Sequence, residues 1–302
     1  MRPSILDPRA CRTNLLISFA VLALLSSVGG ANSAHYSGPK VALTKAVIVH
    51  PAGQASSAAT AELLQYEIEK RTGIALSRRT AMPSDDVPAI VLGSAKAYPT
   101  SAQFPPGLAC PGEAESYAIW VDKTSRSAPT IYLVGRDDRG ALFAAGRLII
   151  LLNLSAKHIA LPENIRIASA PDTTIRAHQI LSSTQCEDGF VDWDDLAQKH
   201  QHIRDMVLFG TNGFEPRPAD DVDDYMEKLG IDLFGKIKCD ELIDYAKLSD
   251  DEIRNLYTNL VGVDHFTTYG GDASGSRPPM EFFPTLDRIL PLILESHPGA
   301  KN

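Results

Sequence analysis

Strand-like and helix-like segments alternate regularly over residues 172–302. Four short apolar or β-branched runs end in polar residues, and a segment of helical spacing or composition follows each; the runs are 174–182, 212–217, 231–239 and 263–269. Parallel strands need such crossover helices, and functional groups collect at the carboxyl ends of these strands. The pattern therefore predicts a parallel β/α structure over residues 171–302.

The number of units limits what this region can form. Four βα units are the pace of a (β/α)8 barrel, but a closed barrel needs roughly 250 residues. The expected fold class is thus α/β: an N-terminal α/β sandwich domain followed by a partial (β/α)8, or TIM-type, barrel that is truncated. Because half a barrel has uncovered sheet edges, we expect self-association through the open barrel edge.

Residues 35–170 predict the N-terminal α/β domain. Strands are expected in four apolar runs and helices in two longer segments; the strands are 46–50, 89–93, 117–121 and 130–134, and the helices 56–72 and 139–152. In the first helix Ala61, Leu64 and Ile68 form one apolar stripe, and Gly73 is the expected carboxyl stop. The natural domain boundary is the junction of Pro171 and Asp172.

Residues 1–34 have the composition of a secretory signal peptide. Three arginines precede an apolar stretch over residues 15–28, which is too short to span a bilayer comfortably, and small residues follow it. We expect cleavage after Ala31 or Ser33 and a secreted or periplasmic protein without a stable membrane anchor. An uncleaved amino-terminal anchor is the alternative.

Composition excludes some classes of function. The sequence is 44% hydrophobic and 22% charged, as in globular proteins, and its net charge of −8 argues against nucleic acid as a partner. Removal of the leader would leave Cys110, Cys186 and Cys239, whose spacing matches no zinc motif. One disulfide with a free thiol and three unpaired thiols both remain open.

A glycine-containing segment between a strand and a helix suggests phosphate binding. Gly135 and Gly140 are too far apart for a dinucleotide fingerprint, and Gly140 is not followed by the Lys-Ser/Thr of a P-loop. We therefore expect a structural role, in which Asp138 caps the helix and Gly140 and Gly146 allow close packing on the sheet.

No metal or cofactor site is predicted. The acidic cluster 220–224 lacks the glycine turn and terminal glutamate of an EF-hand loop, and it suits the first turn of a helix. Four histidines of the C-terminal region show no ligand spacing on one helical face: His178, His200, His202 and His265.

The predicted C-terminal strands carry candidate substrate-binding residues. Arg176 and His178 alternate on the first strand and so face the same side. Glu215 lies near the end of the second strand and Asp240 at the end of the third, whereas Asp272 follows the fourth strand after two glycines that permit a sharp turn. Carboxylates and an arginine that converge at strand ends suit a sugar site. Capping of solvent-facing loops is the alternative.

Three segments resemble known enzyme families. Ile131-Tyr-Leu-Val-Gly-Arg-Asp-Asp-Arg-Gly-Ala-Leu-Phe-Ala-Ala-Gly-Arg-Leu148 resembles the amino-terminal α/β domain that precedes the catalytic barrel in bacterial β-hexosaminidases and α-glucuronidases. Ile175-Arg-Ala-His-Gln179 resembles the first-strand arginine segment of that barrel, and Tyr269-Gly-Gly-Asp272 resembles the fourth-strand Gly-Gly-Asp-Glu of hexosaminidases. The similarity covers nearly all of residues 40–302.

This resemblance implies hydrolysis of O-glycosidic bonds in a poly- or oligosaccharide, without a cofactor. Arg176 would bind sugar hydroxyls, and Asp272 would be the catalytic acid that orients the acetamido group of the substrate. Ala273 stands where the hexosaminidase general acid follows, and a general acid supplies about 100- to 10,000-fold in rate. The alternative is a non-catalytic carbohydrate-binding or pseudoenzyme module.

Overall fold

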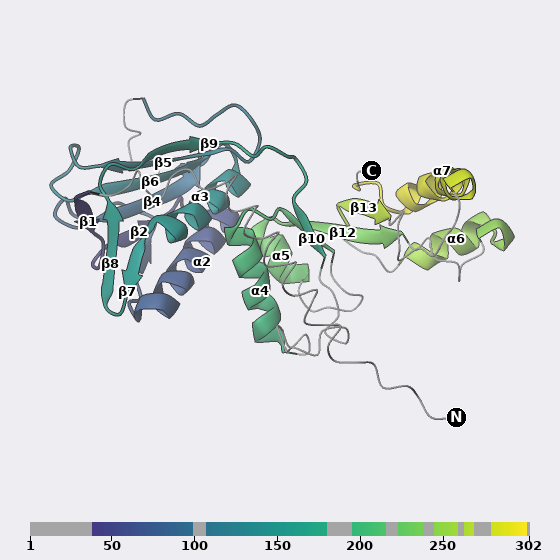
Figure 1. Cartoon of the computed structure of the whole chain (residues 1–302), viewed down its shortest axis with the longest axis horizontal. Coiled ribbons are helices and arrows are strands. Elements are labelled where there is room, and N and C mark those ends of the chain that lie inside the picture. Colours follow the sequence, from purple (N-terminus) through teal and green to yellow (C-terminus); the bar gives the residue numbers. More distant parts are fainter. Residues whose placement is uncertain are drawn as a thin grey trace, which may run out of the picture.

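The computed structural model describes residues 38–98, 107–179, 195–215, 223–237, 245–258, 263–268 and 279–300. The predicted signal peptide, Asp240 and Asp272 lie outside the described residues, as do Cys186 and Cys239. The described elements form two regions that follow one another along the long axis of the molecule (Figure 1).

The first region is built on a six-stranded sheet, called here the N-terminal sheet. Its strand order is β3-β2-β4-β6-β5-β9; the first four strands are parallel, and β5 is antiparallel to both of its neighbours. The strands are β2 Val47–Val49, β3 Ser77–Arg79, β4 Ala89–Ser94, β5 Tyr117–Asp122, β6 Thr130–Gly135 and β9 Arg166–Ser169. The four strands that the sequence predicts are all present. β3 and β9 escape the prediction because they are short and mostly exposed.

Two helices cover one face of this sheet (Figure 1). In α2 (Ala55–Thr72), Ala61, Leu64 and Ile68 are fully buried in the core under the sheet, which confirms the predicted stripe. The helix ends at Gly73, whose φ of 68° is left-handed and suits glycine. The second helix is α3 (Asp138–Leu151). A small antiparallel sheet of order β1-β8-β7 completes the region; its strands are β1 Lys40–Ala42, β7 Asn153–Ser155 and β8 His158–Pro162.

The second region contains a four-stranded parallel sheet, called here the C-terminal sheet. Its order, β10-β11-β12-β13, follows the sequence. The strands are β10 Ala177–Gln179, β11 Gly213–Glu215, β12 Asp232–Ile237 and β13 His265–Thr268. Helices alternate with them: α4 Leu196–Leu208, α5 Asp223–Leu229, η3 Tyr245–Lys247 with α6 Asp250–Tyr257, and α7 Pro279–Ser296. This order agrees with the predicted alternation of parallel strands and helices.

One apolar core contains residues from both regions, that is, from both sides of the predicted boundary. Leu63 of α2 and Leu142 of α3 pack in one cluster with Val207 of α4 and Phe214 of β11. The helices α2 and α3 are therefore covered twice, by the N-terminal sheet on one side and by α4 and α5 on the other (Figure 1). A separate cluster that includes Tyr245 joins α6 to α7.

The glycine-containing segment has a structural role, but two predicted details are wrong. Asp137, not Asp138, caps α3, because its carboxylate accepts the N–H of Gly140 at 2.8 Å. A Cβ atom at Gly146 would lie 2.4 Å from the carbonyl oxygen of Leu208. Gly146 thus approaches α4, not the sheet, since it lies on the face of α3 turned away from the sheet-facing side chains.

Within the described ranges, no helix combines the length and the apolar character needed to cross a membrane.

We predict that Gly146→Ala weakens the packing of α3 on α4. The new methyl group meets the backbone of Leu208, which cannot move aside as a flexible side chain would. The free energy of unfolding in urea should fall by about 1–3 kcal/mol. Gly112→Ala is the matched control, because a Cβ there has nothing within 4 Å; it should change stability by less than about 0.5 kcal/mol. Equal effects of the two substitutions would contradict this packing.

Candidate functional site

The C-terminal sheet has two chemically different faces. Phe214 of β11 is fully buried among residues of α4 and α5, and Leu233 of β12 packs against the same cluster; this is the helix face. Because side chains alternate along a strand, Glu215, Asp232 and Phe234 point to the other side, called here the opposite face. There the ring of Phe234 stacks on His265, with centroids 4.7 Å apart.

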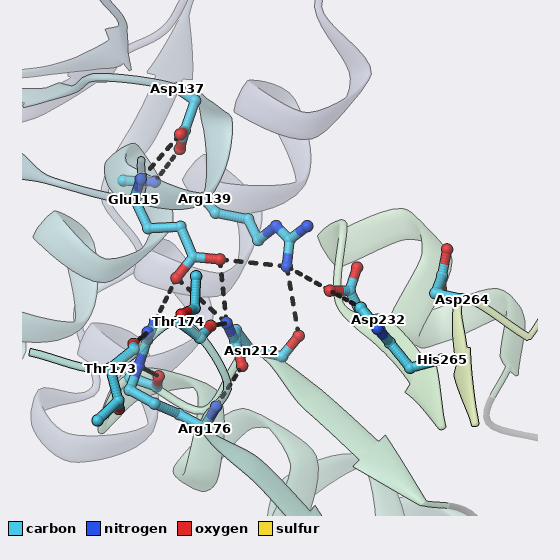
Figure 2. A network of polar contacts seen from close by, with 12 residues as sticks. Glu115, Asp137, Arg139, Thr173, Thr174, Arg176, Asn212, Asp232, Asp264 and His265 are labelled. Carbon is cyan, nitrogen blue, oxygen red and sulfur yellow. Dashed lines mark hydrogen bonds and ion pairs between the residues drawn. The ribbon is translucent and has the colours of Figure 1, made fainter. Parts of the chain in front are cut away.

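The sequence predicts Arg176 at the carboxyl end of a strand. In the structure it lies before β10, at the amino edge of the sheet. Its backbone N–H donates to the side-chain oxygen of Asn212 at 2.8 Å, so the ladder begins only at Ala177. The guanidinium donates to Gly210 O at 2.7 Å, Thr173 O at 2.6 Å and Glu115 Oε2 at 2.5 Å (Figure 2). These contacts place Arg176 at the junction of the two regions.

His178 lies on the helix face. Its Nε2 is 3.1 Å from Nε2 of His202 in α4, and its ring lies edge-on to Phe214 at 5.9 Å between centroids. His178 therefore lies on the face that packs against α4, not on the face that carries Glu215, and its role in substrate binding stays a prediction. The histidine pair cannot be recognised from spacing along one helix, because its members belong to a strand and a helix.

Burial determines the protonation of this histidine pair. It lowers the pKa of His178, and burial followed by the charge of His178 lowers the pKa of His202, against the opposing charge of Asp205. Both rings are thus favoured in the neutral state, in which one N–H can donate to the other ring nitrogen. Among the residues whose placement is described, no three His, Cys, Asp or Glu side chains form a group that could hold a metal ion.

We predict that this pair makes the protein less stable in acid. Folding lowers both pKa values from 6.5, so below about pH 6.5 the unfolded chain binds more protons than the folded one. The contribution of this pair to the free energy of unfolding should be complete above that pH and should be lost as the pH decreases below it. Between pH 7.5 and 5.5, His178→Gln should lose less stability than the wild type does. His158→Gln, at an exposed position of β8, should behave as wild type; a wild-type pH slope for His178→Gln would refute the assignment.

Glu215 lies where the sequence predicts it, at the carboxyl end of β11 and on the opposite face. Phe234 and His265 share that face with it, and neither is predicted as a site residue from the sequence. Ligands of parallel α/β sheets bind beyond the carboxyl ends of the strands. The carboxyl edge of the C-terminal sheet is therefore the candidate ligand site, with Glu215 as its described acid.

A second cluster of polar residues, the Glu115 network, lies at the amino edge of the same sheet. It consists of Glu115, Arg139, Arg176, Asn212, Asp232 and His265 (Figure 2). The Glu115 carboxylate lies 3.2 Å from the Arg139 guanidinium, which donates to Asp232 at 2.8 Å. Asp232 in turn lies 3.3 Å from the His265 ring.

Asn212 connects the starts of three strands within this network. Its side-chain N–H groups lie 3.1 and 3.2 Å from the two Glu115 oxygens and 2.7 Å from Thr174 O. Its carbonyl oxygen accepts the N–H of Asp232 at 3.0 Å. Asn212, with only 3% of its surface exposed, thus pairs with backbone groups before β10 and at the start of β12.

Electrostatics favours the charged form of Arg139. Burial opposes the charge on the guanidinium, but the hydrogen bond and charge of Asp232, followed by the charges of Glu115 and Asp137, raise the pKa of Arg139. No motif marks Glu115 in the sequence, since its partners lie far away along the chain. The Glu115 network joins the two regions at the amino edge of the C-terminal sheet, so it belongs to the framework and not to the candidate ligand site.

A second polar junction joins α2 to α4. The Glu67 carboxylate of α2 is fully buried and is paired with Arg71 of the same helix. From α4, Arg204 Nε lies 3.5 Å and Gln201 Nε2 3.3 Å from it. The Arg204 guanidinium also lies over the ring of Tyr66, 4.4 Å from its centroid. A buried carboxylate needs such partners, so Glu67 favours the docked arrangement of the two regions.

Solved structures of glycoside hydrolases have a similar fold. A family GH115 4-O-methyl-α-glucuronidase with specificity for decorated arabinogalactans matches 86% of this chain, with a TM-score of 0.59 and 12% identity. The family GH20 β-N-acetylhexosaminidase of Streptomyces coelicolor A3(2) matches 86% with a TM-score of 0.54 and 14% identity, and Flavobacterium johnsoniae chitobiase matches 88% with 0.53 and 16%. The likeness is one of fold.

The present chain spans only part of these enzymes: 41% of the α-glucuronidase, 62% of the hexosaminidase and 50% of the chitobiase. No protein-family model and no curated protein matches the sequence. The comparisons therefore support a distant glycoside hydrolase-like fold.

Proposed function

We propose that this chain is part of a glycoside hydrolase-like protein that acts on O-glycosidic bonds of poly- or oligosaccharides. The observation that carries the proposal is the fold likeness, over 86–88% of the chain, to an α-glucuronidase, a β-N-acetylhexosaminidase and a chitobiase. In this proposal the four parallel strands correspond to the first half of a (β/α)8 barrel, preceded by an α/β domain.

The proposed sugar site is the carboxyl edge of the C-terminal sheet. Glu215 supplies a carboxylate there. Asp240 and Asp272 follow the third and fourth strands in the sequence and are proposed to complete the set of hydroxyl-binding acids. Arg176, at the amino edge, is left out of this set.

A binding role without turnover is the second candidate function. Ala273 follows Asp272 where hexosaminidases carry the general acid, and without a proton donor the leaving oxygen departs slowly. This departure favours measurable sugar binding by the 302-residue chain with little hydrolysis.

Titration of sugars tests the proposed site. Hexosamine and glucuronate oligosaccharides are titrated calorimetrically against the wild type, Glu215→Gln and Asp272→Asn. Each substitution removes a charged hydrogen-bond acceptor that is worth about 1.5–3 kcal/mol, so affinity should fall by about tenfold or more. Asp224→Asn is the matched control, because Asp224 is an exposed acid of α5, and its affinity should equal that of the wild type.

Two results would count against this function. Equal affinities of all variants would show that the sugar, if bound, lies elsewhere. Absence of binding of every oligosaccharide to the folded wild type would remove the support for a carbohydrate site. Rapid hydrolysis by the wild type would instead exclude the non-catalytic alternative.

We also propose that the protein is exported. The arginines and the apolar stretch of residues 1–34 support this, and self-association through sheet edges stays part of the proposal. Amino-terminal sequencing of protein recovered from the periplasm or medium should find a start between residues 32 and 34. A cytoplasmic protein that begins at Met1 would refute export.

A further inference from the structure

We propose that Glu115 is a positioning residue through which the N-terminal region holds the amino edge of the C-terminal sheet. Its side chain is only 11% exposed, and it meets groups from three elements: Arg139 of α3, Arg176 before β10 and Asn212 before β11. A single carboxylate thus joins the first region to the start of two neighbouring strands (Figure 2).

The backbone of Glu115 supports a specific role for its side chain. Its φ of 62° is left-handed, a conformation that costs free energy for any residue with a Cβ. The conformation is held by Asp137, which accepts the Glu115 N–H at 2.8 Å while it caps α3. This backbone conformation, just before β5, therefore directs the Glu115 carboxylate toward the C-terminal sheet.

The contacts extend from Glu115 to all four strands of the C-terminal sheet. Asn212 bonds to the backbone of Arg176 and of Asp232, which links β10, β11 and β12. Arg139 bridges Glu115 to Asp232, and His265 places β13 beside that carboxylate. Loss of the Glu115 carboxylate would leave Arg139 paired with Asp232 and would remove the carboxylate that pairs with Arg176.

The position of Glu115 explains what the edge of the N-terminal sheet does. Asp137 and Arg139 follow β6, at the carboxyl edge where ligands bind in open α/β sheets. Here that edge meets protein: Arg139 of the first region contacts Asp232 and Asn212 of the second. We infer that the carboxyl edge of the N-terminal sheet holds the C-terminal sheet in position. The consequence for sugar affinity rests on the proposed function; the positioning itself does not.

Hydrogen exchange of the full chain tests this inference. In Glu115→Gln, which keeps size but removes charge, the amides of Phe214 and Leu233 should exchange about tenfold faster or more, because a charged hydrogen-bond network no longer opposes opening. The amides of Ile90 and Leu133 in the N-terminal sheet should keep their wild-type rates. Glu163→Gln is the matched control: it removes a carboxylate from the surface pair with Lys123 and should leave both sheets unchanged.

Two further variants separate charge from backbone strain and from simple misfolding. Glu115→Gly relieves the left-handed backbone but removes the carboxylate, so it should accelerate exchange in the C-terminal sheet as Glu115→Gln does. Glu115→Gln/Arg176→Gln should accelerate exchange by less than the product of the two single effects, since both remove one interaction. Slower exchange in Glu115→Gly, or multiplicative effects in the double variant, would overturn the proposal.

The remaining outcomes also test the positioning role of Glu115. Unchanged exchange in β11 and β12 of Glu115→Gln would refute the positioning role, and so would equal acceleration in both sheets, which indicates general destabilisation. If the wild type binds a sugar, Glu115→Gln should weaken that binding although Glu115 lies outside the proposed sugar site. If no sugar binds but exchange responds as expected, the proposed function fails while the positioning role stands.

Discussion

The arrangement of this protein depends on carboxylates buried between its two regions. Glu115 and Glu67 both belong to the first region, and both find cationic partners in the second, Arg176 and Arg204. A carboxylate removed from water is costly unless charged donors surround it. Separation of the regions would take Arg176 from Glu115 and Arg204 from Glu67 and leave only the partners within the first region, Arg139 and Arg71. The charges therefore favour the docked arrangement, and the apolar core shared by the two regions stabilises it further.

That core explains why the helices of the first region are apolar on two sides. Leu64 and Ile68 of α2 face the N-terminal sheet, while Ala59 and Leu63 pack against the helices of the second region. Glycine at position 146 lets the α3 and α4 backbones meet directly. The β/α units of the second region therefore pack on the side of α2 and α3 that faces away from the N-terminal sheet.

Local signals in the sequence predict most of the fold. Apolar runs such as 89–93 specify strands, and the stripe through Leu64 with Gly73 at its end specifies α2. The site is less predictable, because it depends on contacts between distant residues. Glu115 lies in a loop without a pattern and meets Arg176, 61 positions away. The predicted position of Arg176 within the strand is wrong, because β10 begins one residue later and the Arg176 N–H bonds to the Asn212 side chain instead of a neighbouring strand.

The residue after Asn212 is a glycine, and this neighbour makes the Asn212 side chain susceptible to deamidation. Asparagine is among the residues that are lost to chemical ageing, and an Asn-Gly bond has little steric protection against attack of the following amide nitrogen on the side chain. Deamidation would replace the donor that faces Glu115 with a second carboxylate, and like charges at that distance repel. Burial of Asn212 restrains the required backbone movement, so a well-folded molecule preserves the amide that its own framework needs, whereas a chain that opens often would age at this bond.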